Sequence, residues 1–305
     1  MKDQDSSVGR RVGVVGLGAM GLGMAGSLRN AGFDVGVHDL RPEVAEAFAH
    51  DGGTAFARAR DLAARVDVLV SVVVNAAQVE SVLFGADGAA DHLGPGGVFV
   101  MCSTVDPGWS AEIEGRLAER GVLYLDAPIS GGAARAAAGE LTMMTSGSAA
   151  AYSVADPVLE AMSSTVYRLG DRAGLGSTVK MVNQLLAGVH IAAAAEAMAV
   201  GIKAGVPAEA LYDVITHSAG NSWMFENRMA HVLAGDYTPL SAVDIFVKDL
   251  GLVLDFGRLE RFPLPLAATA HQMFLQASAS GLGTEDDSAV IKIFPGIDLP
   301  TAAGI

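Results

Sequence analysis

Two features of this chain could do chemistry together: a lysine, Lys180, and a glycine-rich turn far upstream of it. A turn of this spacing binds the pyrophosphate of a dinucleotide, and a nicotinamide dinucleotide can accept a hydride. A hydroxyl substrate that loses a hydride must also lose a proton, which a lysine can take. Together they predict redox chemistry on a hydroxyl group. The turn comprises Gly16, Leu17, Gly18, Ala19, Met20 and Gly21, after the apolar run 12–15.

The three glycines of the turn have separate tasks. Gly16 permits a tight bend, Gly18 lets the backbone approach a pyrophosphate, and Gly21 lets the following helix pack closely on the strand. The start of that helix offers N–H groups and a partial positive charge to the same phosphates. A glycine-rich bend without a ligand is the alternative interpretation. The strand before the turn and the helix after it favour the dinucleotide.

An acidic residue at the end of the second strand supports this interpretation. Asp39 lies 18 residues beyond Gly21, where a carboxylate would accept hydrogen bonds from the adenosine ribose. The same carboxylate would repel a 2′-phosphate, which favours NAD over NADP. His38 or Arg41 could accommodate that phosphate and weakens the preference.

Lys180 opens a polar face on a long apolar helix. With Asn183, Gln184 and Ala187 it has the spacing of one helix side. A lysine near a helix N-terminus opposes the local dipole, and desolvation would lower its pKa and suit it to acid–base work. A solvated surface charge is the alternative. The opposite side carries Val179, Val182, Leu186 and Val189.

Two further segments could contact a ligand. Ser130, Gly131 and Gly132 form a loop whose backbone N–H groups could hold a carboxylate, although an ordinary turn explains them equally well. Lys248 and Asp249 could be a surface ion pair of little consequence.

The polar and aromatic run 221–227 has a simple explanation as a helix start. Ser222 would then cap the helix, with Trp223 and Phe225 packed inward.

The order of elements predicts an α/β fold followed by an all-helical domain. Up to about residue 170, short β-branched runs alternate with helical segments, which indicates a doubly wound parallel sheet covered on both faces. A hinge at 174–177, with Ser177 as the helix cap, would lead into a long helix ending near residue 204. We therefore expect a dinucleotide-binding Rossmann domain at 1–170 and a helical substrate and oligomerisation domain at 171–305. The predicted strands of the first half are 12–15, 35–38, 68–74, 98–102, 123–125, 141–145 and 166–169.

Composition limits the possible partners. The net charge of −14 disfavours nucleic acid and anionic membranes. Cys102 is the single cysteine, so no intrachain disulfide can form, and no Cys/His cluster has the spacing of a metal site. The polar segment 1–11 lacks the apolar core of a signal peptide, and 185–200 is the nearest approach to a membrane span. We expect a cytoplasmic protein without a metal.

In this order, the segments resemble the β-hydroxyacid dehydrogenase family, which includes the 3-hydroxyisobutyrate dehydrogenases; the resemblance covers 12–297. It implies a Rossmann domain joined by a long helix to an all-helical domain, in a homodimer or homotetramer. It implies that Lys180 is catalytic and that Asn183 orients the substrate. The implied cofactor contacts are residues 16–21, Asp39, Val74, Asn75, Thr104 and Lys248, and the implied substrate contacts are Ser130, Gly131, Gly132, Asn221 and Ser222.

Several segments are similar to the subgroup of this family that acts on L-threonate. They are 74–78, 184–191, 220–228 and 285–292. The similarity implies NAD-dependent oxidation of a four-carbon sugar acid at its 2-hydroxyl. Val74 and Asn75 stand where many members carry an apolar residue and proline, which suits a polar substrate. Alternatives are a 3-hydroxyisobutyrate or small aldehyde-acid oxidoreductase and, outside enzymes, a dinucleotide-binding sensor.

Overall fold

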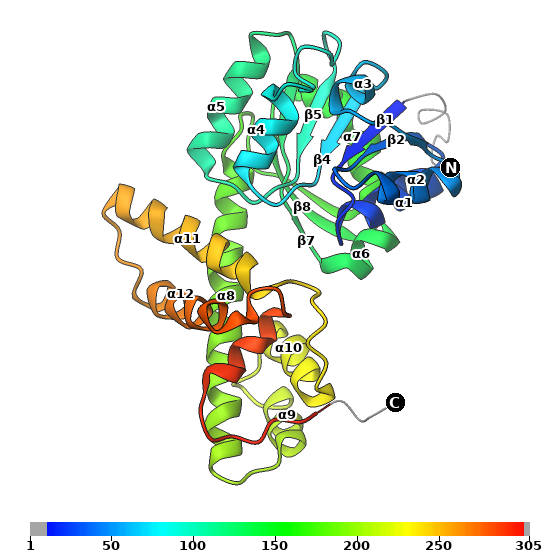
Figure 1. Cartoon of the computed structure of the whole chain (residues 1–305). Helices are drawn as coiled ribbons and strands as arrows, with labels where there is room; N and C mark the ends of the chain where they lie inside the picture. Colours follow the sequence, from blue (N-terminus) through cyan, green and yellow to red (C-terminus); the bar gives the residue numbers. More distant parts are fainter. Residues whose placement is uncertain (1–10, 302–305) are drawn as a thin grey trace. The chain divides into compact units, whose positions relative to one another are not determined.

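A computed structural model describes residues 11–301 of the chain. The chain divides into two compact units, the first ending at Lys180 and the second beginning at Met181. The division falls within a continuous helix, α8 (Leu175–Lys203), which Figure 1 shows in green. The first residues of this helix therefore belong with the α/β unit, whereas the sequence analysis assigned everything after residue 170 to the second domain.

Six parallel strands form the main part of the sheet in the first unit. Their order is β3-β2-β1-β4-β5-β6, so that β1 lies between β2 and β4. The direction of the strand order reverses at β1, and ligands of such sheets bind outside the carboxyl ends of the strands at this switch point. The strands are β1 (Arg11–Val15), β2 (Asp34–His38), β3 (Thr54–Ala55), β4 (Val68–Ser71), β5 (Val98–Met101) and β6 (Leu123–Asp126).

The far edge of the sheet departs from the predicted parallel arrangement. It contains β7 (Ile129–Ser130), β8 (Leu141–Gly147) and β9 (Ser163–Arg168). Strand β8 runs antiparallel to β6 and β7 and parallel to β9. The link from β7 to β8, which contains α6 (Gly132–Ala138), is shorter than the dozen or so residues of a parallel crossover. The prediction of a parallel sheet is therefore wrong at this edge.

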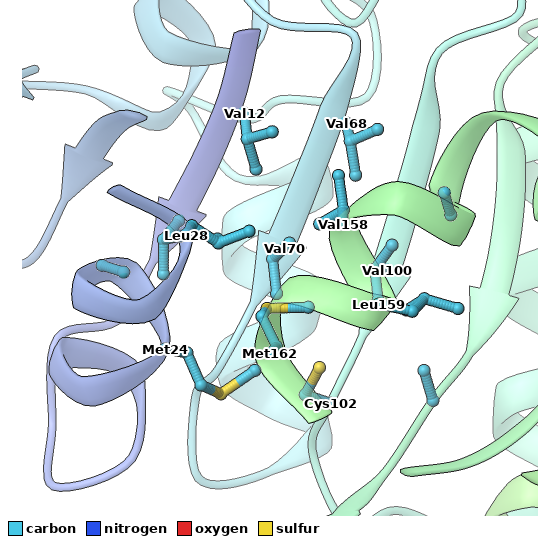
Figure 2. Close-up of a cluster of buried hydrophobic side chains, with 14 of the residues drawn as sticks. Val12, Met24, Leu28, Val68, Val70, Val100, Cys102, Val158, Leu159 and Met162 are labelled. Carbon is cyan, nitrogen blue, oxygen red and sulfur yellow. The ribbon is translucent and has the colours of Figure 1, made fainter. Parts of the chain in front are cut away.

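Helices cover both faces of the sheet, as the alternation of elements predicted. Successive strand residues point to opposite faces, so that Val68 and Val70 enter one core and Leu69 enters the other. Figure 2 shows the first core, where side chains of α1 and α7 lie against the strands. This core is covered by α1 (Gly21–Asn30), α2 (Pro42–His50) and α7 (Ala149–Met162), and the second by α3 (Ala59–Ala63), α4 (Ala76–Phe84) and α5 (Pro107–Ala118).

The second unit is helical, which confirms the predicted absence of a sheet there. Its described residues contain only one isolated bridge, between Ala242 and Asp286. The rings of Phe246 and Phe274 stack in its core, 5.1 Å apart between centroids. Its elements after α8 are α9 (Ala208–Thr216), α10 (Trp223–Ala234), α11 (Val243–Glu260), α12 (Pro265–Ala277), η1 (Ser278–Leu282) and η2 (Asp287–Ile293).

Helix α8 buries its polar side and exposes its apolar side. Lys180 and Gln184 are buried, whereas Val182 and Leu186 are about half exposed. Within residues 11–301, α8 is the one helix long and apolar enough to cross a membrane, and 44% of its most apolar window is buried in the protein. A long helix in the core of a globular protein can have the same length and composition, so the length and apolar character of α8 do not establish a membrane span.

Candidate active site

The glycine turn closes tightly at the carboxyl end of β1. Gly16 has φ +90°, and a Cβ on it would lie 2.6 Å from the carbonyl oxygen of Val72. A Cβ on Gly21 would lie 1.9 Å from the carbonyl oxygen of Gly16. Gly18, in contrast, is exposed and a Cβ there would meet nothing within 4 Å. The turn thus needs glycine at 16 and 21 to close and leaves space beside Gly18 for a ligand.

The start of α1 follows this turn and has no side-chain cap. Met20 occupies the cap position and makes no side-chain cap hydrogen bond. No side chain therefore competes at the cap for the first N–H groups of a ten-residue helix. With the partial positive charge of the helix terminus, these groups suit the phosphates of a dinucleotide.

Asp39 holds the glycine turn in place. Its Oδ2 accepts a 2.7 Å hydrogen bond from the Leu17 N–H, and its Oδ1 accepts bonds of 2.9 and 3.1 Å from the backbone N and Nε of Arg41. Burial would raise the pKa of Asp39, but the hydrogen bonds from Arg41 and Leu17 outweigh it and hold the pKa below its usual value. His38 is engaged with the carbonyl oxygen of Phe56. Of the two residues considered for a 2′-phosphate, Arg41 is thus tied to Asp39.

The segments after β4 and β5 lie at the same edge of the sheet as the turn. Strand β4 ends at Ser71, not at Val74 as predicted, and Asn75 caps the following helix α4. Asn75 Oδ1 accepts a hydrogen bond from Gln78 N–H, and the Gln78 side chain in turn accepts one from Val74 N–H, at 2.9 and 2.7 Å. Both amides thus hold the loop in shape. Ser103, next to Thr104, donates to the carbonyl oxygen of Val73 at 2.6 Å, so β4 and β5 present these loops together.

The Ser130 loop has the backbone that its glycines require. Ser130 ends β7, and Gly131 and Gly132 have φ of +141° and +79° at the start of α6. Residues other than glycine rarely adopt such angles. The structure therefore explains why glycine stands at both positions, whether or not the loop binds an anion.

A buried carboxylate, which the sequence analysis did not single out, fixes the helix that carries Lys180. Asp126 ends β6 and is fully buried. Its Oδ2 accepts 2.9 Å hydrogen bonds from the backbone N–H groups of Gly174 and Ser177, and its Oδ1 accepts one of 2.7 Å from Ser177 Oγ. Ser146 Oγ adds a longer bond to Oδ2. Lys180, which is buried, lies one turn beyond Ser177 in α8.

These contacts show that the prediction of Ser177 as the helix cap is wrong. They also affect the pKa of Asp126. The expected cap, Ser177, lies inside α8, which begins at Leu175; Asp126 from another element bonds the first turn instead. Burial raises the pKa of the Asp126 carboxyl, and the hydrogen bonds from Ser177, Gly174 and Ser146 offset only part of that rise. A negative charge at a helix N-terminus is stabilised by the helix dipole.

In the second unit, two of the predicted residues belong to one buried network. Asn183 Nδ2 donates to Gln184 Oε1 at 3.0 Å, and Gln184 Nε2 donates to Asp249 Oδ2 at 2.6 Å. Lys248 Nζ lies 2.6 Å from Asp249 Oδ1, an ion pair without hydrogen-bond geometry. Asp249 is 2% exposed, so the Lys248–Asp249 pair is not the surface pair considered from the sequence.

Asn221 and Ser222 shape the start of α10. Ser222 Oγ accepts a 3.0 Å hydrogen bond from Phe225 N–H, which confirms it as the cap. Phe225 is buried as expected, but the prediction for Trp223 is wrong, because that residue is 62% exposed. Asn221 Nδ2 donates to the carbonyl oxygen of Thr216, and its buried Oδ1 has no hydrogen-bond partner. Asn221 thus offers an unsatisfied acceptor.

Comparison with known proteins assigns both units. Residues 11–170 match the family model for the NAD-binding domain of 6-phosphogluconate dehydrogenase, and residues 174–294 match that for the NAD-binding domain of NADP-dependent 3-hydroxyisobutyrate dehydrogenase. The chain belongs to the 3-hydroxyisobutyrate dehydrogenase family. Its membership makes it an NAD-binding hydroxyacid dehydrogenase, and the tight bend at 16–21 with the uncapped helix start after it suits this cofactor.

Individual relatives of this dehydrogenase align over almost its whole length. It is 64% identical to an L-threonate dehydrogenase of Cupriavidus necator, over 96% of this chain and 99% of that protein. It is 55% identical to an L-threonate dehydrogenase of Escherichia coli K12, over 95% and 97%. A crystal structure described as 3-hydroxyisobutyrate dehydrogenase from Salmonella typhimurium has a TM-score of 0.89 at 56% identity, covering 93% of this chain and 100% of that one.

The glycine turn gives a direct test of cofactor binding. We expect Gly21→Ala to weaken NAD binding at least tenfold, because its methyl group would displace the Gly16 carbonyl oxygen and open the turn. Gly26→Ala, on the same helix, is the matched control because a Cβ there meets nothing within 4 Å. Titration of both variants with NAD by calorimetry measures the difference. Equal affinities would contradict the tight-turn argument.

Proposed function

We propose that this dehydrogenase oxidises the 2-hydroxyl of L-threonate to 2-oxo-tetronate with NAD. The choice of L-threonate as the substrate rests on the similarity to L-threonate dehydrogenases along almost the entire chain. The site supports the reaction class: a dinucleotide turn at the switch point of the sheet, and a buried lysine on a helix fixed to the same unit. The protein is expected to act in the cytoplasm on this small acid, without nucleic acid or membrane as a partner.

Lys180 is assigned the role of general base, which accepts the proton of the substrate hydroxyl. When bound, NAD supplies the acceptor for the hydride that leaves C2 of the substrate. The neutral amine of Lys180 takes the proton of the C2 hydroxyl as the carbonyl forms, and the ammonium returns it in the reverse reaction. Because Asp126 fixes the first turn of α8, the backbone of Lys180 is held to the end of β6. Such positioning contributes to the rate by limiting the geometries that the reacting groups must search.

The remaining predicted residues are assigned to binding. The N–H groups of the loop at Ser130, Gly131 and Gly132 would hold the substrate carboxylate. Asn183 would meet one hydroxyl and Asn221 would meet another. Ser222 remains assigned to the substrate through its O–H, while its Oγ accepts the N–H of Phe225 and caps the helix.

The same carboxylate that shapes the turn supports NAD over NADP. Asp39 carries its charge at ordinary pH, because its pKa lies below the usual value, and this charge would repel a 2′-phosphate. Arg41 would have to leave Asp39 to bind that phosphate. On the cofactor side, Val74, Asn75, Thr104 and Lys248 remain assigned as further contacts.

A second candidate is 3-hydroxyisobutyrate, favoured by the structural likeness to the Salmonella typhimurium protein described by that name. We would test both with NADH formation from L-threonate, D-threonate, L-erythronate, 3-hydroxyisobutyrate and D-glycerate. L-Threonate should have the highest kcat/KM, and NADP in place of NAD should lower it. A preference for 3-hydroxyisobutyrate would replace the substrate and keep the family. Binding of NAD without any turnover would instead support a sensor.

Replacement of Lys180 tests the assignment of the proton. We expect Lys180→Ala to lower kcat about 10²- to 10⁴-fold, the contribution of a general acid–base group, while NAD affinity changes little. Lys203→Ala is the control, since Lys203 ends the same helix and bonds the carbonyl oxygen of Gly296. Steady-state kinetics and NAD titration of both variants make the comparison. Wild-type kcat in Lys180→Ala would refute the assignment.

We propose further that α8 forms a contact between copies of the chain in a homodimer or homotetramer. Its exposed side carries Leu175, Val179, Val182 and Leu186, each 40% or more exposed, and Val200 farther along. The first four recur at intervals of four, three and four residues, the spacing of helices that pack against one another. A contiguous apolar stripe of this kind is typical of an interaction surface.

Light scattering after gel filtration tests the contact. The wild type should have two or four times the chain mass of 31.2 kDa. Leu186→Glu should lower that mass, because it places a charge in the stripe. Val214→Glu, at an exposed residue of α9, should not. A monomeric wild type, or an unchanged mass in Leu186→Glu, would contradict this arrangement.

A further inference from the structure

The buried carboxylate of Asp249 determines which atoms of two neighbouring amides can face each other. An ionised carboxylate only accepts hydrogen bonds, and Asp249 is ion-paired with Lys248. Gln184 must therefore turn its Nε2 toward Asp249 Oδ2, as it does at 2.6 Å. The reverse orientation would place the amide oxygen against the carboxylate. Because Gln184 and Asp249 are 9% and 2% exposed, water does not screen this preference.

The orientation passes from Gln184 to Asn183. With Nε2 committed to Asp249, Gln184 presents its Oε1 to Asn183, and an oxygen can bond only the donor end of that amide. Asn183 Nδ2 accordingly donates to Gln184 Oε1 at 3.0 Å. The Oδ1 of Asn183 therefore points away from Gln184. Asn183 and Gln184 on α8 and Lys248 and Asp249 on α11 all lie in the second unit.

We propose that Asp249 is a positioning residue for substrate selection. Through Gln184 it turns the Asn183 amide so that the acceptor Oδ1, which points away from Gln184, is offered to the ligand. A site of this polarity selects a hydroxyl group, which donates to Asn183 Oδ1, and disfavours a methylene or carbonyl group at the same place. This inference rests on the proposed function, because it takes Asn183 to contact a polyol acid.

The test compares substrates that differ by one hydroxyl. L-Threonate is set beside its 3-deoxy and 4-deoxy analogues, each with NAD. The wild type should prefer L-threonate to one of the two analogues by at least tenfold in kcat/KM. In Asp249→Asn, residue 249 can donate as well as accept, so the amides lose their fixed orientation. We expect kcat/KM for L-threonate to fall about tenfold while that for the discriminated analogue changes less than threefold.

A matched control and a second variant separate positioning from folding. Asp255→Asn removes an exposed carboxylate of the same helix, which pairs with Arg258, and should leave all three substrates unchanged. If Asp249→Asn does not fold, Gln184→Leu removes the amide that transmits the orientation and leaves the Lys248–Asp249 pair in place. It should reduce the same substrate ratio.

Each other outcome overturns the inference. An equal loss on L-threonate and both analogues would make Asp249 a purely structural residue. A wild type that does not discriminate against either analogue would mean that Asn183 does not bind a hydroxyl. A shifted pH profile of kcat with an unchanged substrate ratio would place the effect of Asp249 on proton transfer. A wild type inactive on L-threonate would refute the proposed function itself, which the substrate panel detects separately.

Discussion

The hydrogen bonds of one buried carboxylate determine where the long helix begins. Asp126, at the end of β6, accepts the N–H groups of Gly174 and Ser177 and the hydroxyl of Ser177. The start of α8 packs so closely on β8 that residue 176 must be glycine, since a Cβ on Gly176 would lie 2.5 Å from the carbonyl oxygen of Met144. Burying a carboxylate costs free energy, which these bonds partly offset. The position of every residue on the first turns of α8, Lys180 included, depends on this contact.

Near the glycine turn, too, polar side chains form hydrogen bonds that hold the backbone in shape. Asp39, the residue expected to recognise the ribose, also accepts the Leu17 N–H, so the turn and the cofactor-facing carboxylate hold each other in place. Asn75 and Gln78 likewise use their amides to hold the neighbouring loop. The polar side chains around the dinucleotide site therefore build the loops of the sheet edge in addition to facing a ligand. Substitutions among them will affect shape and recognition together.

Local patterns allowed the sequence to predict most of the strands, the turn and the helical second half, but not the two-residue strands β3 and β7. Glycine spacing, Asp39 and the Ser222 cap are signals contained within a few residues. Asp126 with Ser177, and Gln184 with Asp249, are instead separated by 51 and 65 positions, and no local pattern connects them. Ser177 has the residue type of a cap, but a distant carboxylate supplies the bonds. In α8 the side that carries Lys180 and Gln184 is buried and the side that carries Val182 and Leu186 is exposed, which the helical spacing alone does not reveal.

The continuity of α8 through both compact units has a consequence for how this chain can change in length. A helix turns by about 100° and rises about 1.5 Å for each residue. One residue inserted between Ser177 and Lys180 would leave the Asp126 contact intact and turn Lys180 by about 100° from the helix side that it now occupies. Surface loops, in contrast, generally tolerate insertions. In the segment 177–180, the number of residues therefore matters as much as their identity.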